Sequence, residues 1–318
     1  LCFALGVGDE LVPPTGKPAK VWVGGEMHSL PKRHFLGVPL DLDELEELSL
    51  LTNEGAKRAK LDLTLPDNKP KEVETVGSLI RRRLGDEVMD RLVGPLLGGI
   101  NAGDADDLCL ESGVPQLFNA SQGDISLVRS VQDFLKNQNR DPASPVFLTH
   151  PDGLQTVVKR LEQEIDSNIR MNERVTSVEI SDNSIVVKGS QEYRTDAVIL
   201  CIPAFAAANL LHHSCPKTSN LLADIQYASM AFITFAFNKA DVPQFNGSGF
   251  LVGRDENLLT TACSWTSEKW AHLESDDTVF LRLSVGRFGD TEALDMEDNT
   301  LIGKLKGELE TLTGIKAD

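Results

Sequence analysis

Two short runs of basic residues are the side chains best suited to ligand chemistry in this sequence. Arg81, Arg82 and Arg83 form the densest basic run, and Lys32 and Arg33 form a second cluster in a loop. Guanidinium and ammonium groups bind carboxylates and anionic lipid headgroups. The arginine run is more typical of a solvated helix face, whereas a loop cluster beside a hairpin is a somewhat better candidate for ligand binding.

The common catalytic and metal-binding motifs are missing from the sequence. Its six histidines show no metal-ligand spacing, its five cysteines contain no CxxC pair, and neither GxSxG nor HExxH occurs. These patterns argue against a metal site, a disulfide framework and hydrolase chemistry. GxxxxGK[ST] is also absent, and GVGDEL at residues 6–11 is more typical of a helix end than of a dinucleotide loop.

The composition excludes one further class of function. The chain has 318 residues, enough for two domains, and 31 basic against 48 acidic side chains give a net charge of −17. A nucleic-acid-binding protein needs a basic face, so this balance argues against nucleic acid as a partner. The longest uncharged apolar run, residues 197–211, contains Pro203 and is too short to span a bilayer.

Periodicity predicts which elements position these side chains. Residues 20–30 predict a β-hairpin around Gly24-Gly25, and the loop PKRHFLGVP after it is predicted to be irregular. Leucines and valines at helical spacing predict about four helices between residues 41 and 136, and another helix over 154–165.

The rest of the chain is predicted to be rich in strands. RVTSVEI, SIVVKG and DAVILCIPA read as strands, the last as a central parallel strand because it is almost wholly apolar. Segments after Tyr227 alternate as in an antiparallel sheet, which a helix over 296–313 closes. Composition and periodicity alone therefore indicate an α/β protein with a helical insertion.

Several blocks of sequence resemble one family. Residues 76–111, VGSLIRRRLGDEVMDRLVGPLLGGINAGDADDLCLE, are similar to the signature of the oxygen-dependent porphyrinogen oxidases of heme biosynthesis. The similarity continues, in the family's order, through VWVGGEMHSLP, FLTHPDGLQTVVKRLEQEI, RVTSVEI, DAVILCIPAFAAANLL and FLRLSVGRFGD. It extends over nearly the whole chain.

The resemblance implies a fold of the monoamine-oxidase-like superfamily. That fold is α/β plus α+β: a split, Rossmann-like FAD-binding domain, an antiparallel-sheet substrate domain and a helical insertion domain. Residues 1–30 are expected to form a first part of the substrate domain, and residues 31–136 the helical, membrane-docking-like domain. Residues 137–215 are expected to form part of the FAD-binding domain, and residues 216–318 the main substrate-binding sheet. The N-terminal GxGxxG and the C-terminal FAD segment of the family are not found, so the sequence is expected to be an internal fragment that does not hold FAD or turn over alone.

The resemblance also implies a reaction. The family removes six electrons from protoporphyrinogen IX or coproporphyrinogen III in three FAD turnovers, and oxygen is reduced to hydrogen peroxide. The flavin carries the chemistry, so no catalytic side chain is expected. Porphyrinogen and molecular oxygen are the expected reactants, and a later enzyme of the heme pathway such as ferrochelatase is an expected partner.

Individual site residues transfer from the family at a few positions. Val175 matches the position whose backbone contacts the FAD adenine. Leu251, Leu259 and Leu281 match apolar strand residues that pack on the porphyrinogen ring, although a plain core role explains each leucine equally well. A cation is expected to bind the substrate propionates, and Lys32 or Arg33 is the predicted source.

Two other functions stay open at this point. One is another FAD-dependent amine oxidase or desaturase of the same superfamily, which the Arg-Arg-Leu-Gly-Asp-Glu and Pro-Leu-x-Gly-Gly blocks disfavour. The other is a non-catalytic porphyrin or heme carrier. The enzyme is expected to lie in the cytoplasm, because the segment LDELEELSLL is acidic and is repelled by anionic lipid headgroups. Peripheral association with the inner face of the membrane is the alternative.

Overall fold

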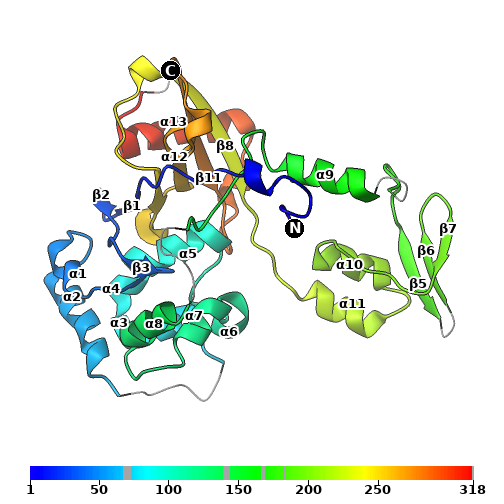
Figure 1. Cartoon of the computed structure of the whole chain (residues 1–318), viewed down its shortest axis with the longest axis horizontal. Coiled ribbons are helices and arrows are strands. Elements are labelled where there is room, and N and C mark those ends of the chain that lie inside the picture. The colour runs from blue at the N-terminus through cyan, green and yellow to red at the C-terminus, as the bar shows by residue number, and fades with distance from the viewer. Residues whose placement is uncertain (67–72, 139–143, 166–168, 182–183, 317–318) are drawn as a thin grey trace. The chain divides into compact units, whose positions relative to one another are not determined.

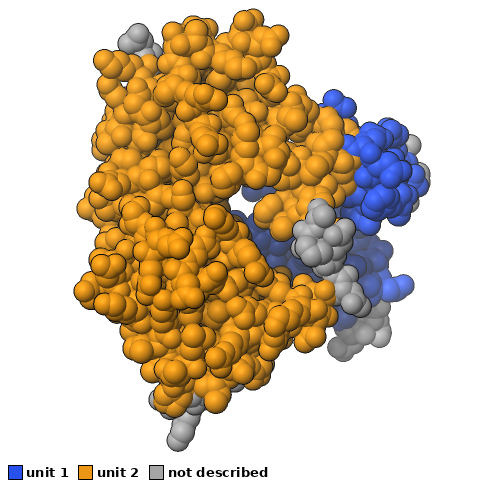
Figure 2. Space-filling view, turned by 60° about the vertical axis from the view of Figure 1, so that its left-hand side comes forward, with its two compact units in different colours: residues 1–10, 152–227 blue, residues 11–151, 228–318 orange. Residues whose placement is uncertain are grey.

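The computed structural model describes residues 1–66, 73–138, 144–165, 169–181 and 184–316. The chain forms two compact units, each made of two segments (Figures 1 and 2). The smaller unit contains residues 1–10 and 152–227, and the larger contains residues 11–151 and 228–318. Each unit is described by itself below.

The larger unit is built on a six-stranded mixed sheet. Its strand order is β2-β1-β9-β10-β11-β8. β1 and β9 are parallel, and every other neighbouring pair is antiparallel. The predicted hairpin and mostly antiparallel sheet are therefore confirmed. The strands are β1 (Ala19–Val23), β2 (Glu26–Ser29), β8 (Ala231–Asn238), β9 (Gly249–Val252), β10 (Thr260–Trp265) and β11 (Thr278–Val285).

Alternation along the strands gives this sheet two different faces. Every second residue of β11 is buried, and these side chains pack with α13 (Asp298–Thr313) in one hydrophobic core. The leucines of α13 that face the sheet recur at helical spacing, as the helix predicted over 296–313 requires. On β8 the side chains that point away from this core are exposed. One face of the β8–β11 half is thus covered and the other is open.

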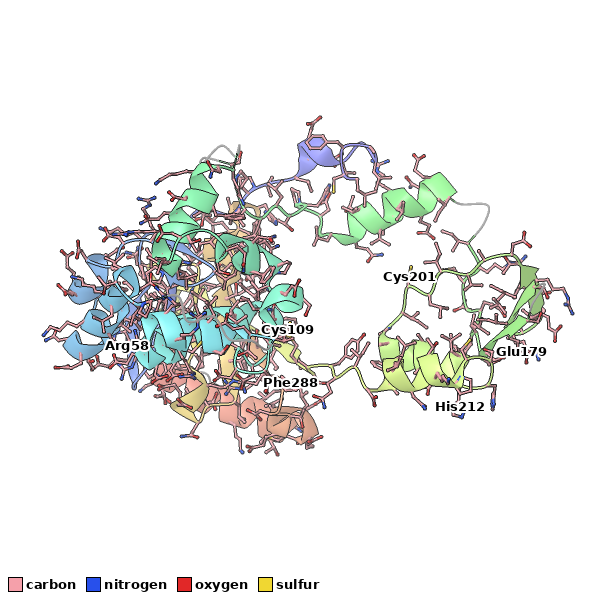
Figure 3. All side chains as sticks on the ribbon, turned by 90° about the horizontal axis from the view of Figure 1, so that it is seen from below. Arg58, Cys109, Glu179, Cys201, His212 and Phe288 are labelled. Carbon is pink, nitrogen blue, oxygen red and sulfur yellow. The ribbon has the colours of Figure 1, made fainter. Side chains whose placement is uncertain are left out.

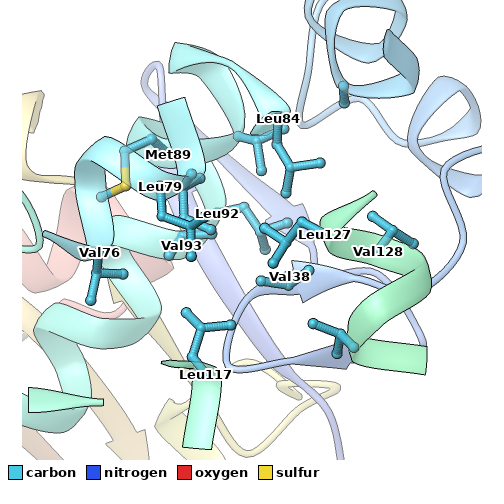
Figure 4. Close-up of a cluster of buried hydrophobic side chains, with 14 of the residues drawn as sticks. Val38, Val76, Leu79, Leu84, Met89, Leu92, Val93, Leu117, Leu127 and Val128 are labelled. Carbon is cyan, nitrogen blue, oxygen red and sulfur yellow. The ribbon is translucent and has the colours of Figure 1, made fainter. Parts of the chain in front are cut away.

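A bundle of short helices packs at the β1–β2 end of the sheet, around a second core (Figure 4). Val21 and Val23 of β1 join this core, which the helices and the segments that connect them otherwise supply. The helical region predicted from the apolar spacing is confirmed, but the described residues divide it into eight short α-helices rather than about four. Its helices are α1 (Glu44–Glu47), α2 (Asn53–Lys60), α3 (Val76–Leu84), α4 (Asp86–Val88), a π-helical turn (Met89–Val93), α5 (Gly94–Asn101), α6 (Leu110–Gly113), α7 (Pro115–Ala120) and α8 (Leu127–Lys136).

The loop between the hairpin and these helices is more regular than expected. β3 (His34–Phe35) and β4 (Val38–Pro39) form a second, very short hairpin. Leu36 and Gly37 connect them with φ values of 50° and 89°. Two successive residues with positive φ make the tight turn that suits a two-residue hairpin, and a leucine at the first position hides this signal in the sequence.

The smaller unit contains a three-stranded antiparallel sheet and three helices. The sheet order is β5-β6-β7. Its strands are β5 (Ser177–Ser181), β6 (Ser184–Lys188) and β7 (Glu192–Thr195), and its helices are α9 (Gln155–Ile165), α10 (Ala204–Leu211) and α11 (Pro216–Ala223).

The central parallel strand predicted in DAVILCIPA is wrong. β7 ends at Thr195, and the apolar stretch after it, which contains Cys201 (Figure 3), is extended without being part of a sheet. Ile199 in this stretch is 88% exposed. A parallel strand needs a neighbour that pairs with its backbone, and no strand of the described residues does so here. Apolar composition alone does not show whether a neighbouring strand pairs with this segment.

Candidate functional site

A cavity of about 360 Å³ lies in the larger unit, where the loop after α5 meets the ends of β9 and β11. The loop turns at Ala102, whose φ of 51° is left-handed, and Asp104 then accepts a hydrogen bond from the backbone N–H of Asp106 (3.0 Å). The Ala102 carbonyl accepts a 2.7 Å hydrogen bond from the N–H of Phe288, in the loop after β11 (Figure 3). Two segments almost 200 residues apart thus form one wall.

Two arginines enter this cavity from the same edge of the sheet. Arg254 follows β9 and Arg287 follows β11, each directly after a Val-Gly pair. Both β9 and β11 are antiparallel to β10, so their ends lie at the same edge. Arg254 donates to the carbonyl oxygens of Phe288 (3.2 Å) and Gly103 (3.1 Å), which fixes its guanidinium beside the loop.

A third arginine at the cavity wall is occupied by the chain itself. Arg81 donates to Asp106 (2.8 Å), Asp90 (2.7 Å) and Asp86 (3.0 Å). Its hydrogen bond keeps the pKa of Asp106 below its ordinary value. Arg81 therefore holds α3, α4 and the loop after α5 together, and its donors are not directed at a ligand.

The rest of the arginine run also has structural partners. Arg82 pairs with Glu74 at 2.8 Å, and Arg83, only 2% exposed, pairs with Asp62 at 2.6 Å. The solvated-face interpretation is therefore wrong for Arg83. The run is a set of ion pairs within the chain, which its sequence spacing does not reveal because the carboxylates come from four places along the sequence.

The open sheet face lies next to the cavity. Leu251 pairs in register with Ala262, Ala262 with Ser284, and Ser284 with Phe232, so these four residues form one row across four strands. Leu251 packs against α5, because a Cβ added at Gly99 would lie 2.4 Å from its Cδ2. Gly99 also lines the cavity, which places the cavity at the Leu251 end of the row.

The exposed end of this row is aromatic and cationic. Phe232 is exposed on β8, and the guanidinium of Arg282 lies 4.9 Å from the centre of its ring. Arg282 is two residues before Ser284 on β11 and therefore points to the same face. An apolar surface with a cation beside it suits a ligand that combines an apolar ring with anionic groups.

The three leucines predicted to contact substrate do not lie together. Leu251 is half-buried and packs at the core of the short helices, whereas Leu259 packs at the core under α13. The backbone N–H of Leu259 donates to Glu308 at 2.7 Å. Leu281 is 0% exposed in the core under α13, so its side chain has no surface open to a ligand in this structure. A substrate role for Leu251, Leu259 and Leu281 stays a prediction.

The predicted cationic loop lies outside the cavity. Lys32 and Arg33 are exposed directly before β3, and neither is among the residues that line the cavity. The backbone N–H of Lys32 donates to Glu44 at 3.0 Å. The neighbouring His34 is half-buried, and this burial lowers its pKa against the opposing effect of Glu44. Binding of propionates by Lys32 or Arg33 stays a prediction.

Val175 lies in the smaller unit, half-buried in the extended segment before β5. No backbone hydrogen bond of Val175, or of residues 198–202, is seen in the part of the chain that the structure describes. In the described structure the backbone of both segments is therefore open to a further partner. Whether that group is the FAD adenine stays a prediction.

Sequence reasoning missed Arg254 and Arg287. Both follow a strand in the same tripeptide, Val-Gly-Arg, and this repeat was the available signal. The sequence does not indicate that Ser284 and Ala262 lie on the open sheet face, because small residues in a strand do not show which of its faces is covered.

Comparison with known proteins decides the family. Residues 3–318 match the family described as flavin containing amine oxidoreductase. The chain belongs to this family. Coproporphyrinogen III oxidase of Bacillus subtilis (strain 168) is 30% identical to it, over 99% of this chain and 68% of that protein. Protoporphyrinogen oxidase 1, chloroplastic, of Arabidopsis thaliana is 22% identical, over 96% of this chain and 60% of that protein.

A solved structure agrees with this family membership. The crystal structure of a protein of Exiguobacterium sp. 255-15, provisionally named protoporphyrinogen oxidase, matches with a TM-score of 0.84 and 29% identity. The match covers 100% of this chain and 69% of the other. The resemblance noted from the sequence blocks, and the amine-oxidase fold that it implied, are therefore confirmed. Among the described residues, no helix has the length and apolar character to cross a membrane.

Proposed function

We propose that this chain is part of an FAD-dependent enzyme that oxidises a porphyrinogen, protoporphyrinogen IX or coproporphyrinogen III, to the porphyrin. Six hydrogens and six electrons leave the substrate in three steps, and three molecules of oxygen become three of hydrogen peroxide. The open sheet face carries this proposal: three of the four residues in the row from Leu251 to Phe232 are apolar, and Arg282 lies beside its exposed end. The names of the relatives support the same substrate class.

This chain contributes position and electrostatics to such a reaction. FAD supplies the hydride acceptor when it is bound. The apolar row holds the flat ring by contact, and arginines hold its carboxylates so that one ring carbon is presented in a fixed orientation. The backbone of Val175 is proposed to contact the adenine end of the cofactor, supported by its unpaired state in the described structure.

The location of the enzyme is part of the same proposal. We place it in the cytoplasm, because α1 carries Glu44, Glu46 and Glu47 in one turn. This acidic helix opposes approach to anionic headgroups.

The test uses the complete protein that contains this sequence. It is supplied with FAD and with each porphyrinogen in turn, while porphyrin fluorescence and oxygen uptake are recorded together. We expect three molecules of oxygen consumed for each porphyrin formed. Putrescine serves as the amine control, and we expect no oxidation of it. Oxidation of neither porphyrinogen, or of putrescine alone, would refute the proposal.

The 318-residue chain is assayed alongside the complete protein. We expect the chain alone to be purified without flavin, as the missing GxGxxG motif indicates. A stoichiometric flavin absorption spectrum of the chain would contradict that expectation without bearing on the substrate.

A further inference from the structure

Arg287 is a buried cation, and its partners among the described residues leave most of its hydrogen-bond donors unused. The residue is 8% exposed, and the one hydrogen bond that its side chain makes among the described residues runs from Nε to Asp290 at 3.4 Å. Its two terminal nitrogens have no hydrogen-bond acceptor among the described residues, although the residue lines the cavity beside the loop after α5. A guanidinium withdrawn from water requires partners. Arg287 thus presents a free pair of donors to the cavity.

The surroundings of Arg287 favour an anion there. Burial lowers the pKa of Arg287, and the charge of Arg254, which two carbonyl oxygens fix nearby, lowers it further. Four carboxylates also line the cavity, but three of them already contact an arginine: Asp90 and Asp106 contact Arg81, and Asp104 contacts Arg254. Asp255, the fourth, and Asp290 raise the pKa of Arg287, but burial and Arg254 outweigh them.

The size and place of the cavity identify the anion that suits it. Its volume of about 360 Å³ is at the lower end for a ligand pocket. This size suits a short arm rather than a whole macrocycle. Gly99 lines the cavity and touches Leu251, so the cavity adjoins the apolar row of the sheet. A ring lying on the row would have one side arm within reach of the cavity.

We propose that Arg287, supported by Arg254, binds a propionate of the porphyrinogen in this cavity. The proposal rests on the proposed function, and it adds a carboxylate-binding site distinct from the exposed loop of Lys32 and Arg33. The terminal nitrogens of Arg287 match a carboxylate with two parallel hydrogen bonds, a geometry that lysine does not reproduce. Arg287 is then a substrate-binding residue.

The test measures binding separately from turnover. The complete protein is titrated with the oxidised product coproporphyrin III, and its fluorescence change gives the Kd for wild type, Arg287→Met and Arg287→Lys. Loss of charged hydrogen bonds predicts a Kd raised by about 10- to 150-fold in Arg287→Met. Arg287→Lys is expected to lie between the other two. In turnover with either porphyrinogen, KM is expected to rise by a similar factor while kcat changes little.

Arg194→Met is the matched control, because Arg194 is exposed on β7 of the smaller unit. It is expected to leave Kd and KM unchanged, and thermal unfolding of all variants checks that they fold. Unchanged Kd in a folded Arg287→Met variant would overturn the proposal. It is also overturned if propionate ion or inorganic phosphate binds in an Arg287-dependent way while coproporphyrin binding does not depend on Arg287.

Failure of the proposed function gives a different result. In that case the wild-type protein oxidises no porphyrinogen at all, whatever residue stands at position 287. Arg287-dependent binding of coproporphyrin III would still support the carboxylate site in such a protein.

Discussion

The buried ion pair between Asp62 and Arg83 permits a quantitative prediction about what holds the helical region together. Asp62 is 0% exposed and accepts four hydrogen bonds. Arg83 Nε and Leu127 N–H donate to Oδ1 at 2.6 and 3.1 Å, and Ser126 Oγ and Val128 N–H donate to Oδ2 at 2.6 and 3.0 Å. The carboxylate therefore caps the start of α8 and neutralises a buried arginine at the same time.

Asp62→Asn keeps the shape of the side chain and removes these two functions. The amide nitrogen, in place of Oδ2, would face the Val128 N–H, so one backbone donor loses its acceptor. Arg83 keeps its carbonyl contacts to Asp62 and Pro66 but loses its counter-charge. Removing one partner of a buried ion pair costs about 3–5 kcal/mol. That is a large part of the roughly 5–15 kcal/mol by which domains are stable.

Urea unfolding followed by tryptophan fluorescence measures this cost. All three tryptophans of the chain, Trp22, Trp265 and Trp270, lie in the larger unit, so the signal reports the unit that contains the pair. The matched control is Asp133→Asn, which removes the exposed ion pair with Lys136 on α8. We expect the control to change the free energy of unfolding by no more than about 1 kcal/mol.

A double variant separates the ion pair from the cap. In an Arg83→Met background the Asp62→Asn change no longer leaves a buried cation alone, so we expect it to cost less than in wild type. The reasoning is refuted if Asp62→Asn costs no more than Asp133→Asn. Equal costs of Asp62→Asn in the two backgrounds would show that the pair itself contributes nothing.

Two further predictions concern a close packing contact and a titrating group. Gly77→Ala is expected to lower the free energy of unfolding by about 1–3 kcal/mol, because its Cβ would lie 2.9 Å from a backbone Cα of the loop after α5. Gly303→Ala places its Cβ where nothing lies within 4 Å, so it is expected to raise the free energy of unfolding by about 0.5–1 kcal/mol. An equal effect of the two changes in urea unfolding would contradict this reasoning. Burial lowers the pKa of His34, so the unfolded chain binds a proton at this residue more readily than the folded chain does. The contribution of His34 to the free energy of unfolding therefore falls as the pH drops below its ordinary pKa near 6.5, by at most about 1.4 kcal/mol per pH unit. Unfolding at pH 7 and 5.5 should therefore show a smaller pH dependence in His34→Gln than in wild type, and identical dependence would refute this cause.

The sequence alone predicted the elements whose periodicity is local. The hairpin at Gly24-Gly25, the helical region and the closing helix α13 follow from spacing within one segment, because each buries a single face against whatever packs there. Family membership was also readable, because several blocks recur in order along the chain. The exposed stretch around Ile199 shows the limit of this reasoning, since an apolar run does not show whether a strand lies beside it.

Only the tertiary structure decided which charged residues are available to a ligand. The sequence alone does not distinguish Arg81, Arg83 and Arg287. Arg81 and Arg83 form ion pairs with carboxylates from other segments, whereas Arg287 keeps free hydrogen-bond donors in a cavity. The reason is physical: an arginine's role depends on the partners within about 4 Å of its guanidinium. Those partners come from segments that only folding brings together. The sequence therefore determined the family and the elements, and the fold determined where an anion can bind.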